Sequence, residues 1–354
     1  LREGEQRPGV EYTADQKVGA ARVLDELGVD YLQLGFPVAS EKTREVVDRL
    51  DTDAKTTGIA RAIPSDVEAA LDAGVDVVDL FAPTSSAQLE AVLGAPREEM
   101  VAAVQEAAAL ARAGGAAVHL TAMDGFRTET SHLDDLFGAV EAECYTVADT
   151  VGSRTPAGVT SFLESLETDL EKVGVHFHDD LGVGTANALA AGRAGVGKVD
   201  VSVGGIGERA GNTAFEELVA ATAVGEEPFS LDVAESALLP GAHRVLETLG
   251  ESVEVDKPLL GSEVFSHESG LHTAAMLDQP STFEPFDPGQ FGGKRRLLFG
   301  AKSGAGAARG LLECAEKDPT DANVEALLDA LGDLEDEIGV EEAVELAAQV
   351  AGDR

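Results

Sequence analysis

Residues 173–203, VGVHFHDDLGVGTANALAAGRAGVGKVDVSV, contain a short apolar strand pattern, an alanine-rich helix pattern and a second strand pattern. A segment of this kind is typical of two parallel strands joined by a crossover helix. Outward from it, the same alternation runs back through the chain and forward to about residue 225. We therefore expect repeated βα units that build a parallel sheet.

The repeat predicts an α/β fold, a (β/α)8 TIM barrel over residues 1–228 whose first strand is truncated. Seven strands are expected at Tyr31–Phe36, Thr56–Ala60, Val75–Phe81, Ala117–Ala122, Tyr145–Asp149, Val173–His178 and Lys198–Val203. Expected helices include Ala14–Leu27, Glu41–Leu50, Ser65–Ala73 and Thr185–Ala194, with Ser65 as an N-cap and Gly74 as a C-terminal stop.

A helix precedes the first of these strands, so an eighth strand should come before that helix and end at Leu1–Glu3. The full gene product would then carry a short additional N-terminal segment. An open doubly wound sheet is the structural alternative, because alternation of elements alone does not prove that the sheet closes.

The alternation of strand and helix patterns ends after the expected barrel. Over residues 229–354, helical pieces surround a loop rich in Pro, Phe and Gly at Pro280–Gly293, and a polar helical tail follows. This pattern predicts a linker, a lid and a mainly helical accessory region.

The composition limits the partners and the compartment. The formal net charge is -39, which opposes binding to nucleic acid or to an anionic membrane. The acidic residues are spread along the chain, as in proteins that stay soluble in a salty, halophilic cytoplasm; an ordinary acidic enzyme is the alternative. No long apolar run or export signal occurs, and the two distant cysteines, Cys144 and Cys314, fit a reducing cytoplasm.

The sharpest local signal is the segment His176–Asp180 (HFHDD), at the end of an expected strand. Residues i and i+2 of a strand face the same side, so both imidazoles should point into the barrel while Phe177 packs outward. The carboxyl ends of barrel strands carry the catalytic residues of this fold. The pair indicates a metal site, and two hydrogen-bonded structural histidines are the alternative.

Glu3 should reach the same rim, since strand one and the strand ending at His178 are separated by only one strand in a closed barrel. Two imidazoles with a carboxylate suit Mn²⁺, Zn²⁺, Fe²⁺ or Mg²⁺ and leave coordination positions open for a chelating substrate. Arg2 is either a solvated arginine or a fixed cation facing charge that develops on an enolate.

A glycine-rich loop, Gly204–Asn212 (GGIGERAGN), follows the last expected strand. Glycines allow close approach of the backbone to a ligand, and this is where the fold often binds phosphate. The spacing is not that of a dinucleotide fingerprint.

Together these segments resemble the 2-isopropylmalate and homocitrate synthase family, within the metal-dependent lyases of the TIM barrel. The resemblance spans nearly the whole chain. Its motifs are Leu1–Gln6 (LREGEQ), Gly35–Ser40 (GFPVAS), Ala148–Gly152 (ADTVG), His176–Gly182 (HFHDDLG), Gly204–Asn212 (GGIGERAGN), His267–His272 (HESGLH) and Glu284–Pro288 (EPFDP).

The resemblance implies an acyltransferase of amino-acid biosynthesis, leucine biosynthesis included, that condenses acetyl-CoA with a 2-oxo acid and releases CoA. It implies that a divalent metal (Mn²⁺, Mg²⁺ or Zn²⁺) binds to Glu3, His176, His178 and Asn212. Arg2, Asp124 and His272 would be catalytic, and a homodimer would exchange its lids. The implied substrate-binding residues are Gln6, Arg127, Thr150, Gly205 and Glu208.

Two departures from the family pattern affect the acid–base chemistry. Where the family has a catalytic glutamate, this chain has Met123, which cannot move a proton. A usual glutamate just before the Gly-Phe-Pro segment is Gln33 here, which keeps hydrogen bonding without the charge. Asp124 could replace the glutamate only if the backbone turned it inward, because neighbours on a strand face opposite sides.

Several readings stay open. The acceptor could be 2-oxoisovalerate, 2-oxoglutarate or, as in citramalate synthases, pyruvate. A same-fold acyl-CoA lyase is disfavoured because such enzymes carry a cysteine in a mobile glycine-rich loop, and none lies in Gly204–Asn212. A non-catalytic paralogue that binds metal and a 2-oxo acid is the non-enzyme reading, favoured by Met123 and Gln33.

Overall fold

The structure is a computed structural model that describes residues 1–352, and it divides into two compact units. Unit 1 is Leu1–Ser252, and unit 2 comprises the described residues from Val253 onward. The expected boundary between the barrel and the linker, at residue 228, stays a prediction.

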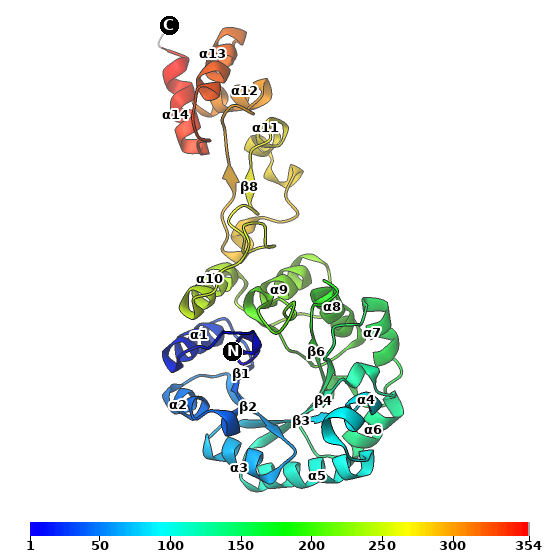
Figure 1. Cartoon of the computed structure of the whole chain (residues 1–354). Coiled ribbons are helices and arrows are strands. Elements are labelled where there is room, and N and C mark those ends of the chain that lie inside the picture. Colours follow the sequence, from blue (N-terminus) through cyan, green and yellow to red (C-terminus); the bar gives the residue numbers. More distant parts are fainter. Residues whose placement is uncertain (353–354) are drawn as a thin grey trace. The chain divides into compact units, whose positions relative to one another are not determined.

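Unit 1 is built on a sheet of seven parallel strands in sequential order, each paired with the next along the chain. The strands are β1 (Tyr31–Gly35), β2 (Lys55–Arg61), β3 (Val77–Pro83), β4 (Ala117–Met123), β5 (Cys144–Asp149), β6 (Val173–Phe177) and β7 (Lys198–Val199). All seven predicted strands are confirmed, although β7 is shorter than expected. The sheet is curled, with helices on its outer side (Figure 1).

Sequential order with helices on one side identifies a singly wound sheet of the TIM-barrel class and excludes the doubly wound alternative, whose strand order reverses. Leu1 and Arg2 lie outside regular structure, and a short 3-10 helix spans Glu3–Gln6. This segment runs beside β1, since the Arg2 backbone N–H donates to the Gln33 carbonyl at 3.2 Å.

The helices of unit 1 cover the sheet. They are α1 (Ala14–Glu26), α2 (Lys42–Arg49), α3 (Pro64–Asp72), α4 (Ser86–Gln88), α5 (Arg97–Ala113), α6 (Thr130–Ala139), α7 (Pro156–Leu163), α8 (Gly184–Ala194), α9 (Phe215–Val224) and α10 (Leu238–Leu249). The helix α10 lies against α1, where Gly241 and Gly19 permit close approach to Leu27 and Thr248.

One predicted cap is wrong. The helix α3 begins at Pro64, after Ile63 as its N-cap, and no side chain caps it. Proline fits the first helical position because its fixed φ suits the helix and its missing N–H would be unbonded there. Gly74 follows the helix at φ +77°, so the predicted stop is confirmed.

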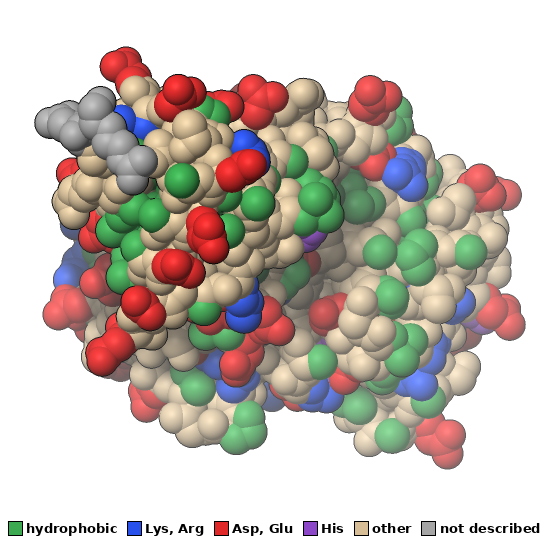
Figure 2. Space-filling view, turned by 90° about the horizontal axis from the view of Figure 1, so that it is seen from above, with side chains coloured by type: hydrophobic (Ala, Val, Ile, Leu, Met, Phe, Trp, Pro, Cys, Tyr) green, Lys and Arg blue, Asp and Glu red, His purple; other side chains and the backbone are tan. Residues whose placement is uncertain are grey.

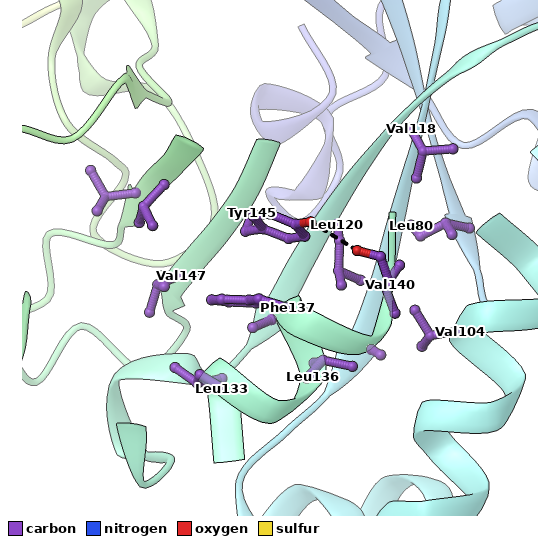
Figure 3. Packing of buried hydrophobic residues seen from close by; sticks show 14 of the residues in the cluster. Leu80, Val104, Val118, Leu120, Leu133, Leu136, Phe137, Val140, Tyr145 and Val147 are labelled. Carbon is purple, nitrogen blue, oxygen red and sulfur yellow. Dashed lines mark hydrogen bonds between the residues drawn. The ribbon is translucent and has the colours of Figure 1, made fainter. Parts of the chain in front are cut away.

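The main core lies between the sheet and the helices. On β4, Val118, Leu120 and Ala122 point outward into this core and leave His119, Thr121 and Met123 on the inner face. Figure 3 shows Leu120 with Phe137 and Tyr145, whose rings stack at 4.8 Å. Apolar packing outside thus leaves the inner face free for polar chemistry.

Unit 2 is mainly helical, as predicted. Its elements are β8 (Ser266–His267), α11 (Gly270–Asp278), β9 (Arg296–Leu297), α12 (Ala305–Cys314), α13 (Asp321–Gly332) and α14 (Val340–Val350). It has its own core, which includes Met276, Phe299, Leu311 and Leu327. The Pro280–Gly293 segment contains only short 3-10 turns at Pro280–Thr282 and Pro288–Phe291.

The surface carries many carboxylates. In the face shown in Figure 2, Asp and Glu side chains are scattered rather than gathered in one patch. No helix within residues 1–352 is long and apolar enough to cross a membrane.

Candidate active site

The histidine pair is placed as the alternation predicts. Phe177 is fully buried in the outer core, beside Phe126 at 5.2 Å between ring centroids. His176 and His178 therefore face the interior of unit 1, with ring centroids 5.2 Å apart. The apolar packing of Phe177 fixes the direction of both imidazoles.

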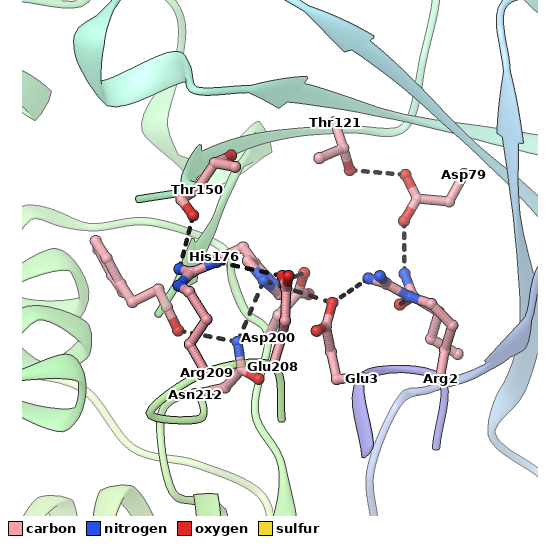
Figure 4. Close-up of polar contacts among 12 residues, drawn as sticks. Arg2, Glu3, Asp79, Thr121, Thr150, His176, Asp200, Glu208, Arg209 and Asn212 are labelled. Atoms are coloured by element: carbon pink, nitrogen blue, oxygen red, sulfur yellow. Dashed lines mark hydrogen bonds and ion pairs between the residues drawn. The ribbon is translucent and has the colours of Figure 1, made fainter. Parts of the chain in front are cut away.

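Glu3 joins the two imidazoles at the carboxyl end of β6. Figure 4 shows Glu3 beside His176. One ligand atom from each of Glu3, His176 and His178 lies within 4.8 Å of the others. His176 Nε2 and Glu3 Oε1 are 3.7 Å apart. Two ligands at about 2.1 Å from one ion lie roughly 3–4 Å apart, so the cluster has the dimensions of a metal site.

Asn212 stands beside this cluster, because its backbone forms a bridge with His178. Its Nδ2 donates to the Phe177 carbonyl at 3.2 Å and lies 3.3 Å from His176 Nε2. A Cβ at Gly207 would collide with the Asn212 amide, so a side chain there would displace Asn212. The glycine-rich loop thus positions Asn212.

Three buried polar atoms of the cluster have no hydrogen-bond partner among the described residues. They are Glu3 Oε2, His178 Nδ1 and Asn212 Oδ1. An unsatisfied buried group costs about 1–3 kcal/mol, so three at one place need compensation. Oxygen and imidazole donors are those that Mn²⁺, Zn²⁺ and Mg²⁺ accept, and the residues present fit such an ion.

The surroundings of the cluster favour the ligand-competent forms of Glu3 and His178 and the protonated form of His176. Burial alone would raise the pKa of Glu3, but Arg2 and the histidines hold it below its usual value. Burial and the neighbouring His176 lower the pKa of His178 to about 4. Burial would also lower the pKa of His176, but Asp200 and Glu3 raise it.

Opposite the histidines, a chain of hydrogen bonds crosses the interior (Figure 4). Arg2 pairs with Glu3, and its Nε donates to Gln33 Oε1 at 2.7 Å. Gln33 Nε2 donates to Asp79 Oδ2 at 2.9 Å, and Thr121 donates to Asp79 Oδ1 at 2.8 Å. Gln33 therefore keeps its hydrogen-bonding role and connects Arg2 to a buried carboxylate.

Met123 shares the inner face of β4 with Thr121, whereas Asp124 does not continue the strand. Asp124 adopts left-handed backbone, φ 58°, and its side chain is 1% exposed. Arg127 donates to both its carboxylate oxygens at 2.7 Å, and Ser85 donates to one of them. The structure therefore brings Asp124 and Arg127 together as an ion pair; their roles in catalysis and substrate binding stay predictions.

The other predicted binding residues lie at different places. Thr150 Oγ1 accepts from the Asp124 backbone N–H at 2.9 Å. Gly205 is in the turn after β7 at φ +68°, and Glu208 pairs with Arg209 at 3.2 Å. Gln6 ends the 3-10 helix with an exposed side chain. Their assignment to substrate binding stays a prediction.

His272 lies in unit 2, on α11, where its ring stacks on Phe283 at 3.9 Å between centroids. Its predicted part in proton transfer stays a prediction.

Sequence reasoning missed three residues that the structure connects to the site. Asp79 faces inward from β3, and Asp200 Oδ2 lies 3.2 Å from His176 Nδ1. Arg209 pairs with Asp180 at 2.8 Å and donates to the Thr150 carbonyl at 2.8 Å. The signal for the two aspartates was available, because each is a charged residue at an inward position of an otherwise apolar strand pattern.

The interior of unit 1 contains a cavity of about 480 Å³. It lies at the edge strands β1 and β7, where residues such as Leu32, Val201 and Leu249 line it, and its lining also includes Glu3, Gln33, Asp79, His176 and Asn212. A cavity of this size, with a few convergent polar groups, is typical of sites for small molecules.

Comparisons with known proteins identify the family of the chain. The profile of the HMGL-like family matches residues 1–239, and the profile described as homocitrate synthase post-HMGL domain-like matches residues 259–339. Homocitrate synthase AksA of Methanopyrus kandleri is 37% identical over 369 residues, which cover 100% of this chain and 92% of the relative. The probable 2-isopropylmalate synthase of the same organism is 37% identical over 343 residues, covering 95% and 68%.

Among solved structures, an HMG-CoA lyase from Bacillus subtilis superposes with a TM-score of 0.61 at 20% identity, covering 71% of this chain and 92% of that chain. This likeness shows the shared barrel fold. The family profile and the nearly full-length relatives show more: this chain belongs to the HMGL-like family, in the branch that carries the homocitrate synthase post-HMGL domain.

Proposed function

We propose that this chain catalyses a Claisen-type condensation of acetyl-CoA with a 2-oxo acid and releases CoA. The observation that carries the proposal is the cluster Glu3, His176 and His178, with its unsatisfied buried atoms, at the carboxyl end of the curled sheet. Relatives named homocitrate synthase and 2-isopropylmalate synthase support the reaction class.

The metal would be held by Glu3, His176 and His178, with Asn212 as a further donor. A bound divalent ion, Mn²⁺, Mg²⁺ or Zn²⁺, supplies Lewis acidity that polarises the ketone of the 2-oxo acid. Arg2 is fixed between Glu3 and Gln33, so its guanidinium presents a preorganised positive charge to the oxyanion that develops there. Preorganisation matters because no side chain must reorient as charge develops.

The condensation needs a base that takes a proton from the acetyl methyl group. The new bond then joins that carbon to the ketone carbon, and water cleaves the thioester to release CoA. Asp79 is the candidate base. It lines the cavity, and each of its carboxylate oxygens accepts one hydrogen bond from a neutral side chain. Asp124 is less suited, since the Arg127 guanidinium engages both its oxygens.

A second candidate function is favoured by one observation. Met123 stands on the inner face beside Thr121 and cannot transfer a proton. A chain that binds metal and a 2-oxo acid without turnover would have the same metal cluster. The two candidates differ only in whether a base reaches the acetyl methyl group.

The finer assignments belong to the same proposal. The acceptor is 2-oxoisovalerate, 2-oxoglutarate or pyruvate, and the enzyme is a homodimer with lid exchange in a halophilic cytoplasm. The net charge of -39 supports the salty compartment. Light scattering in molar salt tests the dimer.

A thiol-release assay tests the function. Purified protein in high salt receives acetyl-CoA, Mn²⁺ or Mg²⁺, and each 2-oxo acid in turn. Metal-dependent release of CoA with one acid is the expected result and identifies the acceptor. If folded protein that binds Mn²⁺ released no CoA with any of the acids, the synthase assignment would be overturned and the non-catalytic binder favoured.

A further inference from the structure

Beneath the metal cluster, a second layer of charged side chains lies inside the barrel. Lys198 and Asp200 occupy alternate positions at and just after β7, so they share the face that His176 presents from β6. The Asp200 backbone N–H donates to the Val175 carbonyl at 2.9 Å, which continues the parallel register of the two strands. The backbone thus fixes Asp200 next to the first histidine.

The contacts form a chain that ends at the imidazole. Asp200 Oδ2 lies 3.2 Å from His176 Nδ1, and Asp200 Oδ1 lies 2.8 Å from Lys198 Nζ. Lys198 Nζ also donates to Thr146 Oγ1 at 3.3 Å, on β5. Both oxygens of the carboxylate are therefore engaged, and three strands hold its position.

This arrangement determines which nitrogen of His176 faces the cluster. A carboxylate at Nδ1 requires a proton there, so the free lone pair belongs to Nε2. Nε2 is the nitrogen that lies 3.7 Å from Glu3 Oε1 and 3.3 Å from the Asn212 amide. A carboxylate that accepts from the remote nitrogen of a ligating histidine fixes both the ring orientation and the tautomer.

His178 lacks such a partner. Its Nδ1 is buried without a hydrogen bond among the described residues. The two imidazoles are therefore supported unequally: Asp200 contacts His176, and no described residue hydrogen-bonds to His178 Nδ1.

We propose that Asp200, held by Lys198, is a positioning residue that sets the orientation and tautomer of His176 so that Nε2 is presented to the metal. The inference rests on the metal site of the proposed function. It adds two residues to that site, which act through the His176 ring instead of serving as metal ligands.

Mn²⁺ affinity of the full chain, measured by calorimetry in high salt, tests the inference. Asp200→Ala should weaken binding about 10–100-fold, the range for loss of a partner behind a metal ligand. Asp200→Asn keeps an acceptor for the His176 Nδ1–H and should lose less Mn²⁺ affinity. Lys198→Met should lose least, because the carboxylate remains but is no longer anchored.

Asp66→Asn is the matched control. Asp66 is a fully buried carboxylate paired with Arg61 at 2.7 Å, at the start of α3. It should lose thermal stability without change in Mn²⁺ affinity. If Asp200 variants also lost only stability, the pair would be structural and the inference overturned.

A second readout keeps the test independent of folding losses. In Zn²⁺-loaded wild type, ¹⁵N chemical shifts should show His176 protonated at Nδ1 and metal-bound at Nε2; metal at Nδ1 would overturn the inference. A wild type that binds no divalent metal would instead overturn the metal site of the proposed function. Wild-type binding with unchanged Asp200 variants would overturn the positioning role alone.

Discussion

The interior of unit 1 has two walls that differ in how their polar atoms are satisfied. The metal wall (Glu3, His176, His178, Asn212) has three buried atoms without a hydrogen bond. The facing wall (Gln33, Asp79, Thr121, Met123) links its polar side chains by hydrogen bonds of 2.8–2.9 Å. Because burying an unsatisfied polar atom is costly, the first wall favours an external partner, whereas Gln33, Asp79 and Thr121 of the second wall satisfy one another.

The two walls also compare differently with the pattern that the family resemblance implies. The metal wall has every ligand that the resemblance implies, whereas the facing wall has Met123 and Gln33 in place of glutamates. Asp79 is the carboxylate that remains on the facing wall. Binding and proton transfer should therefore respond to different substitutions.

Removing a ligand from the metal wall should have the largest effect. His178→Ala should weaken Mn²⁺ binding by more than the upper end of about 100-fold known for partners behind the ligands. Calorimetry measures it, and CoA release should disappear in parallel. His119→Gln, which changes an inward imidazole on β4, is the control; equal loss in both variants would abolish the distinction between the walls.

Changing the carboxylate of the facing wall should affect rate rather than metal affinity. Asp79→Asn keeps the shape but removes the base, and general-base catalysis is worth about 100-fold or more. We expect kcat for CoA release to fall by that factor with Mn²⁺ affinity unchanged. A rate that stays at the wild-type level would show that Asp79 is not the base.

Asp124→Asn should lower kcat less than Asp79→Asn does, because the Asp124 carboxylate is bound by Arg127 and Ser85. The lost ion pair should cost roughly 1–3 kcal/mol of stability, since the carboxylate is buried. Denaturant unfolding measures this loss. A drop in kcat as large as that of Asp79→Asn would instead return the acid–base role to Asp124.

The smallest expected effect is that of His178→Gln on the pH dependence of Tm in the metal-free protein. The pKa of His178 is about 4 in the fold, below its usual 6.5, so the folded state favours the neutral ring. That contribution to stability is complete above pH 6.5 and is lost as the pH falls toward 4. Tm should therefore fall less steeply over this range in His178→Gln than in wild type.

The exposed His243→Gln is the control for that titration and should keep the wild-type slope. Parallel slopes in wild type and His178→Gln would show that the buried ring contributes nothing to the pH dependence.

Much of the fold followed from local patterns. Seven strands, the helices between them and the helical unit 2 were predicted, because apolar residues recur with the periods of strands and helices. The N-cap at Ser65 was not, since Pro64 competes for the first helical position through its fixed φ. Local chemistry decides such ends within a residue or two.

The sequence by itself determined the direction of His176 and His178, because alternation along a strand is a local property and Phe177 needs an apolar environment. Only the tertiary structure decided that Asp200 supports His176 and that Gln33 connects Arg2 to Asp79. It also decided that Asp124 leaves the strand in a left-handed conformation to meet Arg127 and Ser85. Such contacts join residues on different strands and loops, and the period of a single strand contains no information about which neighbour its side chains will meet.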